Sequence, residues 1–214
     1  KIMISNNSKI RDLNNEFQDE VQRQYTYDFD YMMHNWILEE FESMLVGHEN
    51  CLELGCYKGH FTKLLSKIFT TIHAVEGSSE LYQDLVNTFQ NVSNIEIFNS
   101  LFEDFRPTNS FDNIFMVHVL EHLENPQFVL KRVRNWLSQQ GRLFIVVPNA
   151  RALSRQIAVS ARILEYNTSV SEGEFSHGHR RTYTLDTLIN EVKKSDFQVI
   201  NYGGIFVKGL ANFQ

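Results

Sequence analysis

Cysteine, proline and glycine are all scarce in this sequence. Its 214 residues include 2 Cys, 3 Pro and 10 Gly. So little Gly and Pro excludes collagen-like and low-complexity chains. Two cysteines cannot build a disulfide framework, which indicates a reducing compartment, and we therefore expect a cytoplasmic protein. Cys51 and Cys56 have no other cysteine partners and are not a CxxC pair, so neither a zinc nor a redox role is expected.

Positive charge and long apolar runs are also lacking. Lys and Arg number 20 against 26 Asp and Glu, which gives a formal net charge of −6. Binding to nucleic-acid phosphates needs clustered Lys and Arg, so nucleic acid is not an expected partner. No run approaches the roughly 18 apolar residues of a membrane span. Because the start also shows no signal-peptide pattern, no membrane association is expected.

The sequence does contain the composition of a globular domain and a regular alternation of segments. Apolar residues make up 43% and charged residues 21%, which predicts one domain with a full core, or one domain plus a cap. Short apolar segments alternate with longer amphipathic ones, a pattern typical of βαβ units, a parallel sheet and right-handed crossovers. Strands are predicted at 51–54, 71–75, 95–98, 111–117, 141–147 and 197–202, and helices at 31–46, 59–69, 78–89, 125–137, 150–165 and 184–194.

The residues that end the predicted strands are the informative ones, because open parallel sheets bind ligands beyond the carboxyl ends of their strands. The first strand runs into the loop Glu53-Leu54-Gly55-Cys56-Tyr57-Lys58-Gly59. Gly55 permits a tight turn, and Gly59 lets the following helix approach the sheet. The second strand ends at Glu76, 21 residues after Gly55. At that distance a strand-end acid can accept hydrogen bonds from a ribose.

These features, with the segments FDNIFMVHVLEHLENP at 111–126 and GRLFIVVPN at 141–149, resemble class I S-adenosylmethionine-dependent methyltransferases. The resemblance covers roughly residues 50–150, and residues 177–202 are similar to the family's late segment. It implies a Rossmann-like, doubly wound, mainly parallel α/β sheet of six or seven strands, with flanking helices and a small helical and loop cap. It also implies S-adenosylmethionine as methyl donor and S-adenosylhomocysteine as product. Quinone and sugar O-methyltransferases are loosely similar members.

The resemblance assigns donor-binding roles residue by residue. Glu53 and Gly55 would line the methionine end of the donor, and Glu76 would hold its ribose. Ser100 and Leu101, after the third strand, would contact the adenine edge, although solvated or packing roles are the alternative there. The complete predicted donor set is Tyr27, Glu53, Gly55, Cys56, Tyr57, Gly59, Glu76, Gly77, Ser100, Leu101 and His118.

Three of these positions need comment. The family usually has a third glycine where Tyr57 stands. In a dinucleotide site that glycine lets the backbone meet a pyrophosphate. S-adenosylmethionine has none, so Tyr57 argues against a Rossmann oxidoreductase more than against a methyltransferase. His118, after the fourth strand, would border the methionine part of the donor. Tyr27 lies in an aromatic N-terminal segment and would meet the donor's carboxylate, with simple core packing as the alternative.

Histidines are the candidates for acceptor chemistry. Methyl transfer to a hydroxyl requires alignment of the acceptor and removal of a proton, and histidine is the usual base near neutral pH. His118, His122, His177 and His179 are all plausible, and plain surface positions are the alternative. We select His122 and His179 as the catalytic residues.

The HVLEH segment from His118 to His122 has three interpretations. A zinc-peptidase site would need both histidines on one helix with the glutamate beside the first, and a strand that ends at His118 disfavours it. In the similar quinone O-methyltransferases an acidic residue precedes Glu-His at these offsets, and a divalent metal is implied. His118 replaces that acid here, so we name no metal ligands. The third interpretation is that Glu121 and His122 cap the next helix and orient the loop.

Residues 150–183 are predicted to form an insertion at the acceptor site, with a polar loop at 166–180. Arg180 and Arg181 could grip a phosphate or carboxylate, or simply belong to a solvated basic loop. We expect a small-molecule acceptor, with a hydroxyl of a sugar, nucleotide-sugar or similar metabolite as the target. An RNA or protein methyltransferase and a non-catalytic donor-binding module are the alternatives.

The remaining segments complete the predicted organisation. Residues 1–48 would form N-terminal lid helices, 49–149 the donor-binding core, and 184–214 a C-terminal helix with the last strand or strands of that core. The family's seventh strand is expected to be missing or to lie past Gln214, because only GGIFVKGLANFQ follows the sixth strand. A monomer and a homodimer are equally compatible with the sequence.

Overall fold

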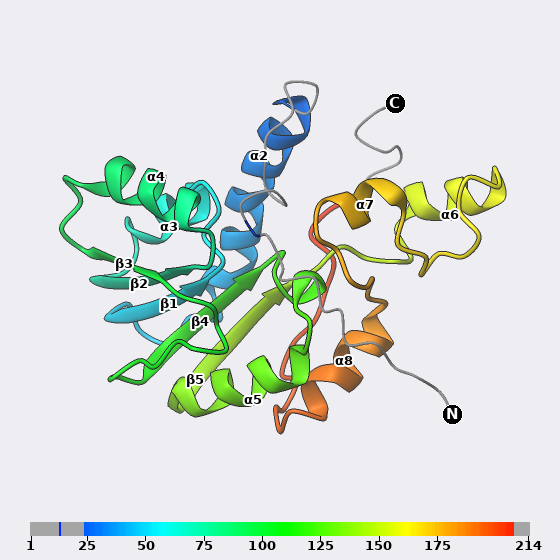
Figure 1. Cartoon of the computed structure of the whole chain (residues 1–214). Helices are drawn as coiled ribbons and strands as arrows, with labels where there is room; N and C mark the ends of the chain where they lie inside the picture. The colour runs from blue at the N-terminus through cyan, green and yellow to red at the C-terminus, as the bar shows by residue number, and fades with distance from the viewer. Residues whose placement is uncertain (1–12, 14–23, 208–214) are drawn as a thin grey trace, which may run out of the picture.

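The computed structural model describes Leu13 and residues 24–207, with residues 24–30 described by their backbone alone. Its centre is one sheet of five parallel strands in the order β3-β2-β1-β4-β5 (Figure 1). The chain builds outward from β1 to β3, then returns beside β1 to add β4 and β5. This order creates a switch point between β1 and β4, where open α/β sheets bind ligands. The strands are β1 (Asn50–Leu54), β2 (Thr71–Glu76), β3 (Ile95–Asn99), β4 (Phe111–Val117) and β5 (Leu137–Val146).

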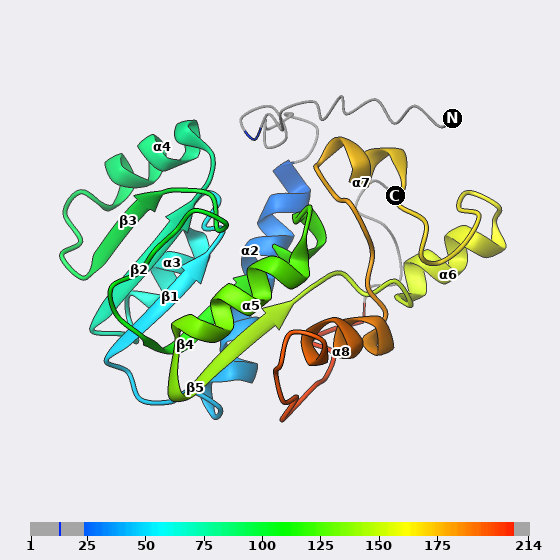
Figure 2. The same cartoon turned by 60° about the horizontal axis from the view of Figure 1, so that its bottom comes forward.

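Helices cover both faces of the sheet, with α2, α3 and α4 on one face and α5 and α8 on the other (Figures 1 and 2). Local sequence sets where they begin. The Ser78 side chain accepts a hydrogen bond from the Leu81 amide, and Asn125 accepts one from Phe128. The helices are α2 (Gln24–Glu42), α3 (His60–Leu65), α4 (Ser79–Phe89), α5 (Pro126–Trp136), α6 (Leu153–Ser160), α7 (Glu172–Ser176) and α8 (Leu185–Lys193), with a short 3₁₀ helix η2 (Leu120–His122).

Alternate residues of each strand feed two separate cores, because successive strand side chains point to opposite faces. Leu52 and Leu54 of β1 belong to the core beneath α5, together with Val129 of that helix. Cys51, the residue before Leu52, points to the opposite face and belongs to the core beneath α2 and α3, with Ile37 of α2. Both faces are covered, which explains why the strands are nearly continuous apolar runs.

The predicted sixth strand at 197–202 is wrong, and the sheet of the described residues has five strands rather than six or seven. The segment alternates half-buried Phe197 and Val199 with exposed Gln198 and Ile200, so its pattern resembles a strand. Phe197 and Val199 pack on the core, but no described strand hydrogen-bonds to the segment. Residues 203–207 form no strand either. The prediction about the seventh strand otherwise concerns residues 208–214, which lie outside the described part.

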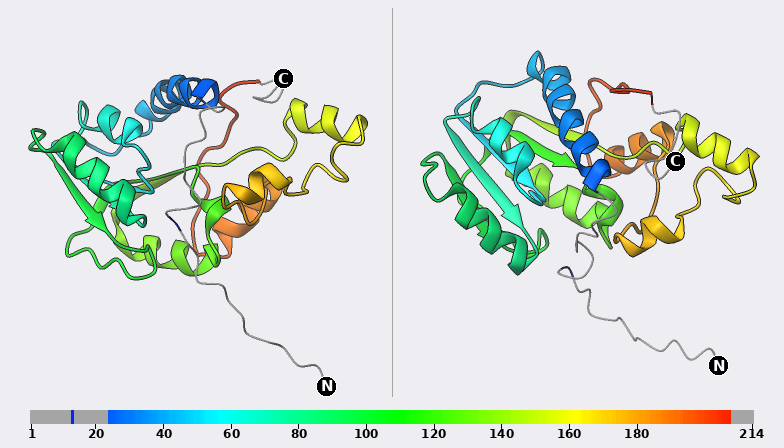
Figure 3. Two further views of the ribbon diagram at one scale, coloured as in Figure 1. Left: turned by 45° about the horizontal axis from the view of Figure 1, so that its top comes forward. Right: turned by 90° about the horizontal axis from the view of Figure 1, so that it is seen from above.

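The region between β5 and α8 leaves the sheet, and its two ends lie side by side. Asn149 and Tyr183 form an isolated parallel bridge, and the Ala150 amide donates to the Tyr183 carbonyl at 2.7 Å. The helix predicted at 150–165 is the shorter α6, and the loop predicted at 166–180 contains α7, which begins with a capping box between Ser171 and Glu174. Figure 3 shows α6 and α7 beyond the β5 end of the sheet.

Helix α2 begins earlier than the predicted range 31–46 and ends at Glu42. The helix was predicted as part of a lid, but it also belongs to the core, since Met33, Ile37 and Leu38 are buried in the cluster shared with α3. Among the helices of the described residues, none has the length and apolar character needed to cross a membrane.

Candidate active site

The loop after β1 has the backbone that the two glycines predict. Gly55 and Gly59 both adopt left-handed conformations, with φ of 80° and 76°. A Cβ on Gly55 would lie 2.6 Å from Cγ2 of Val119, and one on Gly59 would lie 2.5 Å from Cε2 of Phe89. The loop is therefore packed so tightly against α4 and against the segment after β4 that side chains are excluded.

Tyr57 occupies the position of the missing third glycine and still adopts the conformation that glycine favours. Its φ is 49°, in the left-handed region that non-glycine residues rarely use. The loop thus keeps its turn at a conformational cost of about 1 kcal/mol. Such a strained backbone is concentrated at functional sites, which fits the predicted place of Tyr57 in the donor loop.

Glu76 links the two loops that follow β1 and β2. One carboxylate oxygen accepts the Tyr57 amide at 3.1 Å and the other accepts the Ser78 amide at 2.8 Å. Burial raises the pKa of Glu76, and the backbone hydrogen bonds partly oppose that rise. The backbone of the two loops therefore orients this carboxylate at the end of β2, where the resemblance predicts that it holds the ribose hydroxyls.

Glu53 is a buried carboxyl group with unused hydrogen-bonding capacity. The side chain is 2% exposed, and within the described part of the chain its Oε2 atom has no hydrogen-bond partner. Burial raises the pKa of Glu53 to about 8, and the nearby carboxylate of Glu76 also favours the neutral form. A polar atom that is buried without a partner is costly. The orphaned oxygen at the end of β1 fits a ligand that brings a donor group, such as the ammonium of a methionine moiety.

The predicted adenine end lies at the carboxyl end of β3. The Ser100 amide donates to the Glu76 carbonyl at 3.1 Å, while Leu101 is 47% exposed. A Cβ on Gly77 would lie 2.9 Å from Leu13 and 3.5 Å from Leu101. Two apolar side chains, Leu13 and Leu101, therefore lie against Gly77 at this end of the site.

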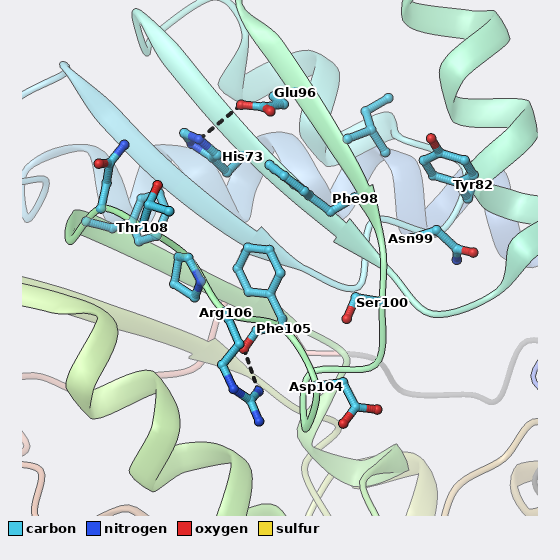
Figure 4. A pocket seen from close by; sticks show the side chains of 14 residues that line it. His73, Tyr82, Glu96, Phe98, Asn99, Ser100, Asp104, Phe105, Arg106 and Thr108 are labelled. Carbon is cyan, nitrogen blue, oxygen red and sulfur yellow. Dashed lines mark hydrogen bonds and ion pairs between the residues drawn. The ribbon is translucent and has the colours of Figure 1, made fainter.

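A pocket of about 680 Å³ runs from this end along β2 and β3 (Figure 4). His73 and Phe98 stack in its floor with ring centroids 5.6 Å apart, and Ser100 and Asp104 line it near the strand ends. The β3–β4 connection crosses here without a helix, which leaves this part of the sheet face open. The pocket shares Ser100 with the predicted donor site, and its lining includes neither the glycine loop nor the predicted catalytic histidines.

The two predicted catalytic histidines lie together although 56 residues separate them in the sequence. His122 ends η2, and His179 follows α7. The centroids of their rings are 4.6 Å apart, and the ring planes are inclined at 81°. Burial lowers the pKa of His179 despite the nearby carboxylates of Glu121 and Glu174, so its imidazole is neutral near pH 7. His177 instead caps the end of α7 through the Gly173 carbonyl.

Glu121 connects this pair to His118. His118 has a φ of 54° directly after β4, and its Nδ1 atom is 3.5 Å from Oε1 of Glu121. Burial alone would raise the pKa of Glu121, but the neighbouring His118 and His122 outweigh it and hold the pKa below its usual value. The amide of Arg180 donates to the Glu121 carbonyl at 2.9 Å. The end of β4 and the insertion are thus joined at this point.

The helix-cap interpretation of Glu121 and His122 is wrong, because Asn125 caps α5. The histidines of HVLEH also do not share one helix, since β4 ends at Val117 and η2 begins at Leu120. The arginines have internal partners: Arg180 pairs with the Glu124 carboxylate at 2.9 Å, and Arg181 donates to the Glu124 carbonyl at 3.2 Å. These contacts with Glu124 hold the loop that carries the arginines against the segment after η2. An anion-binding role for the arginines stays a prediction.

One group beside the donor loop was missed from the sequence. His34 of α2 and His60 at the start of α3 have their Nδ1 atoms 3.1 Å apart, and Tyr31 stacks on His60 at 4.5 Å. Burial, with the nearby His118 and His60, lowers the pKa of His34 to about 3. Helical spacing predicted the apolar face of α2, but it does not indicate that a histidine of this helix contacts a histidine of another helix. The side chain of Tyr27 lies outside the described part of the structure.

Comparison with known proteins identifies the family. A methyltransferase domain family matches residues 11–202. The chain belongs to this family. Pavine N-methyltransferase of Thalictrum flavum subsp. glaucum is 29% identical to it over 102 residues, which are 45% of this chain. The match covers 28% of that relative, so the chain spans well under two thirds of its length.

Solved methyltransferase structures share the fold. A S-adenosylmethionine-dependent methyltransferase from Clostridium acetobutylicum has a TM-score of 0.62 at 17% identity, covering 84% of this chain and 86% of that one. The N-methyltransferase NodS from Bradyrhizobium japonicum, in complex with S-adenosyl-L-homocysteine, has a TM-score of 0.58 at 16% identity, covering 85% and 83%. The predicted Rossmann-like α/β fold with a parallel sheet is confirmed.

Proposed function

We propose that this methyltransferase-family protein transfers a methyl group from S-adenosylmethionine to a small-molecule acceptor and releases S-adenosylhomocysteine. The observation that carries the proposal is the contact between Gly55 and Val119, where a Cβ on the glycine would lie 2.6 Å from Cγ2 of the valine. Val119 directly follows His118, so the donor loop touches the segment that carries the histidines. In this proposal the donor and acceptor groups would meet at the switch point between β1 and β4.

The donor would lie across the carboxyl ends of β1, β2 and β3. Glu53, with its orphaned oxygen, would accept from the ammonium of the methionine part. Glu76 would accept from the ribose hydroxyls, and Leu101 with Leu13 would offer apolar contacts to the adenine. In this role the tight packing at Gly55 and Gly59 serves to bring backbone, rather than side chains, against the donor.

The acceptor would lie between the donor's sulfonium and the histidine pair. Its lone pair forms the new bond to the methyl carbon while the carbon–sulfur bond breaks and returns its electrons to sulfur. His122 and His179 would activate the acceptor. The neutral imidazole of His179 can accept a proton, so it suits an acceptor that must lose one. Residues 150–183 would close the acceptor site, since the insertion carries His179 and is anchored to Glu121.

For the acceptor we propose a hydroxyl of a sugar, nucleotide-sugar or similar metabolite. The support is the polar lining that Glu121, His122 and His179 provide. The name of the curated relative, pavine N-methyltransferase, makes an amine the competing acceptor class. Incubation with isotopically labelled donor and a panel of hydroxyl and amine metabolites would separate the two, because mass spectrometry locates the labelled methyl group. Labelling confined to amines would refute the hydroxyl proposal.

The donor assignment is tested by titration with S-adenosylhomocysteine in a calorimeter. We expect Glu76→Ala to weaken binding about a hundredfold or more, because hydrogen bonds to a charged carboxylate are each worth about 1.5–3 kcal/mol. Glu80→Ala is the matched control, since Glu80 is an exposed acid in the first turn of α4. Circular dichroism checks that both variants fold. Unchanged affinity in a folded Glu76→Ala protein would overturn the ribose assignment.

A further inference from the structure

Three metal-binding side chains converge at the acceptor site. Glu121, His122 and His179 each place one ligand atom within 4.8 Å of the other two. Carboxylate and imidazole ligands lie about 2.0–2.2 Å from a bound Zn²⁺, so atoms that share one ion are roughly 3–4 Å apart. The ligand atoms of the three side chains would therefore have to approach one another by roughly 1–2 Å at most to share one ion.

The carboxylate of Glu121 gives the second, independent observation. The side chain is 1% exposed, and its Oε2 atom has no hydrogen-bond partner in the described part of the chain. The other oxygen, Oε1, is 3.5 Å from Nδ1 of His118. A buried carboxylate oxygen with no partner is destabilising unless a proton donor or a cation satisfies it. A cation beside His122 and His179 would do so.

The backbone holds the two halves of this cluster in place without the ion. The Arg180 amide donates to the Glu121 carbonyl at 2.9 Å, and the His179 amide donates to the Glu174 carbonyl at 3.0 Å. Glu174 is itself bound by Arg155 and by the capping box of α7. The insertion therefore presents His179 to η2 from a fixed loop, as a preorganised site requires.

We propose that Glu121, His122 and His179 bind one divalent transition-metal ion of the Zn²⁺ type, which joins the insertion to the core at the acceptor site. The placement beside the acceptor rests on the proposed function. Two imidazoles and one carboxylate favour Zn²⁺, Fe²⁺ or Mn²⁺ over Mg²⁺, which prefers oxygen ligands. With the ion bound, His122 and His179 would act on the acceptor through the metal rather than as free bases. Three protein ligands leave a coordination position open for a water or an acceptor oxygen.

The sequence alone named no metal ligands, whereas the structure brings three candidate ligands together. The resemblance to quinone O-methyltransferases directs attention to residue 118, where His118 replaces the acid. In the structure the third donor comes instead from the insertion, at His179. The ligand set is therefore richer in nitrogen and specific to the tertiary structure of this chain.

The test is metal binding by the full chain after chelator treatment, followed by calorimetric titration with ZnCl₂ and by the visible absorption of added CoCl₂. We expect one ion per chain, no competition from millimolar MgCl₂, and an affinity reduced about a hundredfold or more in His179→Ala and Glu121→Gln. His177→Ala is the matched control, because His177 lies on the same loop but caps α7. Its affinity is expected to equal that of the wild type.

Three results would refute the proposed metal site. The first is the absence of saturable Zn²⁺ and Co²⁺ binding. The second is undiminished metal affinity in a folded His179→Ala protein, and the third is an equal loss of metal affinity in His177→Ala. Where His179→Ala fails to fold, His179→Gln takes its place, since it keeps the size of the side chain. Titration of the same samples with S-adenosylhomocysteine separates the proposals. Donor binding and methyl transfer without metal binding would defeat only the metal site, whereas metal binding without donor binding would defeat the methyltransferase proposal.

Discussion

At the residue scale, the donor site depends on carboxyl groups that are kept away from water. Glu53 and Glu76 lie at the ends of neighbouring strands and differ in how they are satisfied. Backbone amides that include those of Tyr57 and Ser78 bind Glu76, whereas Oε2 of Glu53 has no hydrogen-bond partner among the residues that the structure describes. An unsatisfied acid favours its neutral form. Glu53 is therefore the group whose charge should change most when a cationic ligand arrives.

The raised pKa of Glu53 makes stability depend on pH. The pKa rises from 4.5 to about 8 in the folded protein, so the folded state holds a proton that the unfolded state has lost between these values. Its contribution is complete below pH 4.5 and is lost as pH rises through 8, at up to about 1.4 kcal/mol per pH unit. Urea unfolding of the ligand-free protein at pH 5 to 8 should show this loss, and Glu53→Gln should remove it.

The comparison of wild type and variant isolates Glu53 from other groups. His34 acts in the opposite sense, because its lowered pKa makes stability fall as pH drops below 6.5. That contribution is common to both proteins and cancels in the difference. The exposed Glu80→Gln variant should follow the wild-type profile. A Glu53→Gln protein with the same dependence on pH as the wild type would show that Glu53 is already ionised in the fold.

At the element scale, the packing of α3 against α4 rests on one glycine. Gly59 is the N-cap position of α3 and has a φ of 76°. A Cβ there would lie 2.5 Å and 2.9 Å from ring atoms of Phe89 and 2.7 Å from a methyl group of Leu85. Both side chains are buried in the core of α4, so neither can yield without moving the helix.

Gly59→Ala should therefore destabilise the protein by about 2–4 kcal/mol, the sum of an overpacked core and an unfavourable backbone conformation. Chemical denaturation measures this difference directly. Gly173→Ala is the control, because a Cβ on Gly173 meets nothing within 4 Å and its φ is not positive. A loss no larger than that of the control would mean that α3 and α4 separate easily.

At the scale of the whole molecule, the insertion is a unit held together by one arginine. Arg155 of α6 donates to the carbonyls of Asn167 and Ser169 and pairs with Glu174. These contacts connect α6, the following loop and α7. No side chain of α6 is buried, so polar contacts rather than a core keep this unit in shape.

Arg155→Ala should loosen the insertion without weakening the donor site. We expect faster hydrogen exchange across residues 165–180, unchanged affinity for S-adenosylhomocysteine, and slower methyl transfer because His179 is no longer held. Arg151→Ala is the control, since Arg151 is an exposed neighbour whose partner Asp186 lies 3.5 Å away on α8. Unchanged exchange in Arg155→Ala would contradict the role given to this arginine.

Most of the fold and the donor loop could be predicted from local patterns. Strand β4 has the predicted bounds, 111–117, and the other core strands lie close to theirs because buried parallel strands are short apolar runs. The failure at 197–202 has a physical reason. Alternation reports which residues are half-buried, and a segment can show it while packing on a core without a neighbouring strand to bond to.

The sequence by itself determined the order of strands and helices, the glycine loop and the acid at the end of β2, because these depend on neighbours a few residues apart. Only the tertiary structure decided that His179 meets Glu121 and His122, that His34 meets His60, and that Asn149 meets Tyr183. Contacts of that kind depend on how loops and helices from distant parts of the chain pack. No spacing in the sequence records them, and the proposed acceptor site is built almost entirely from them.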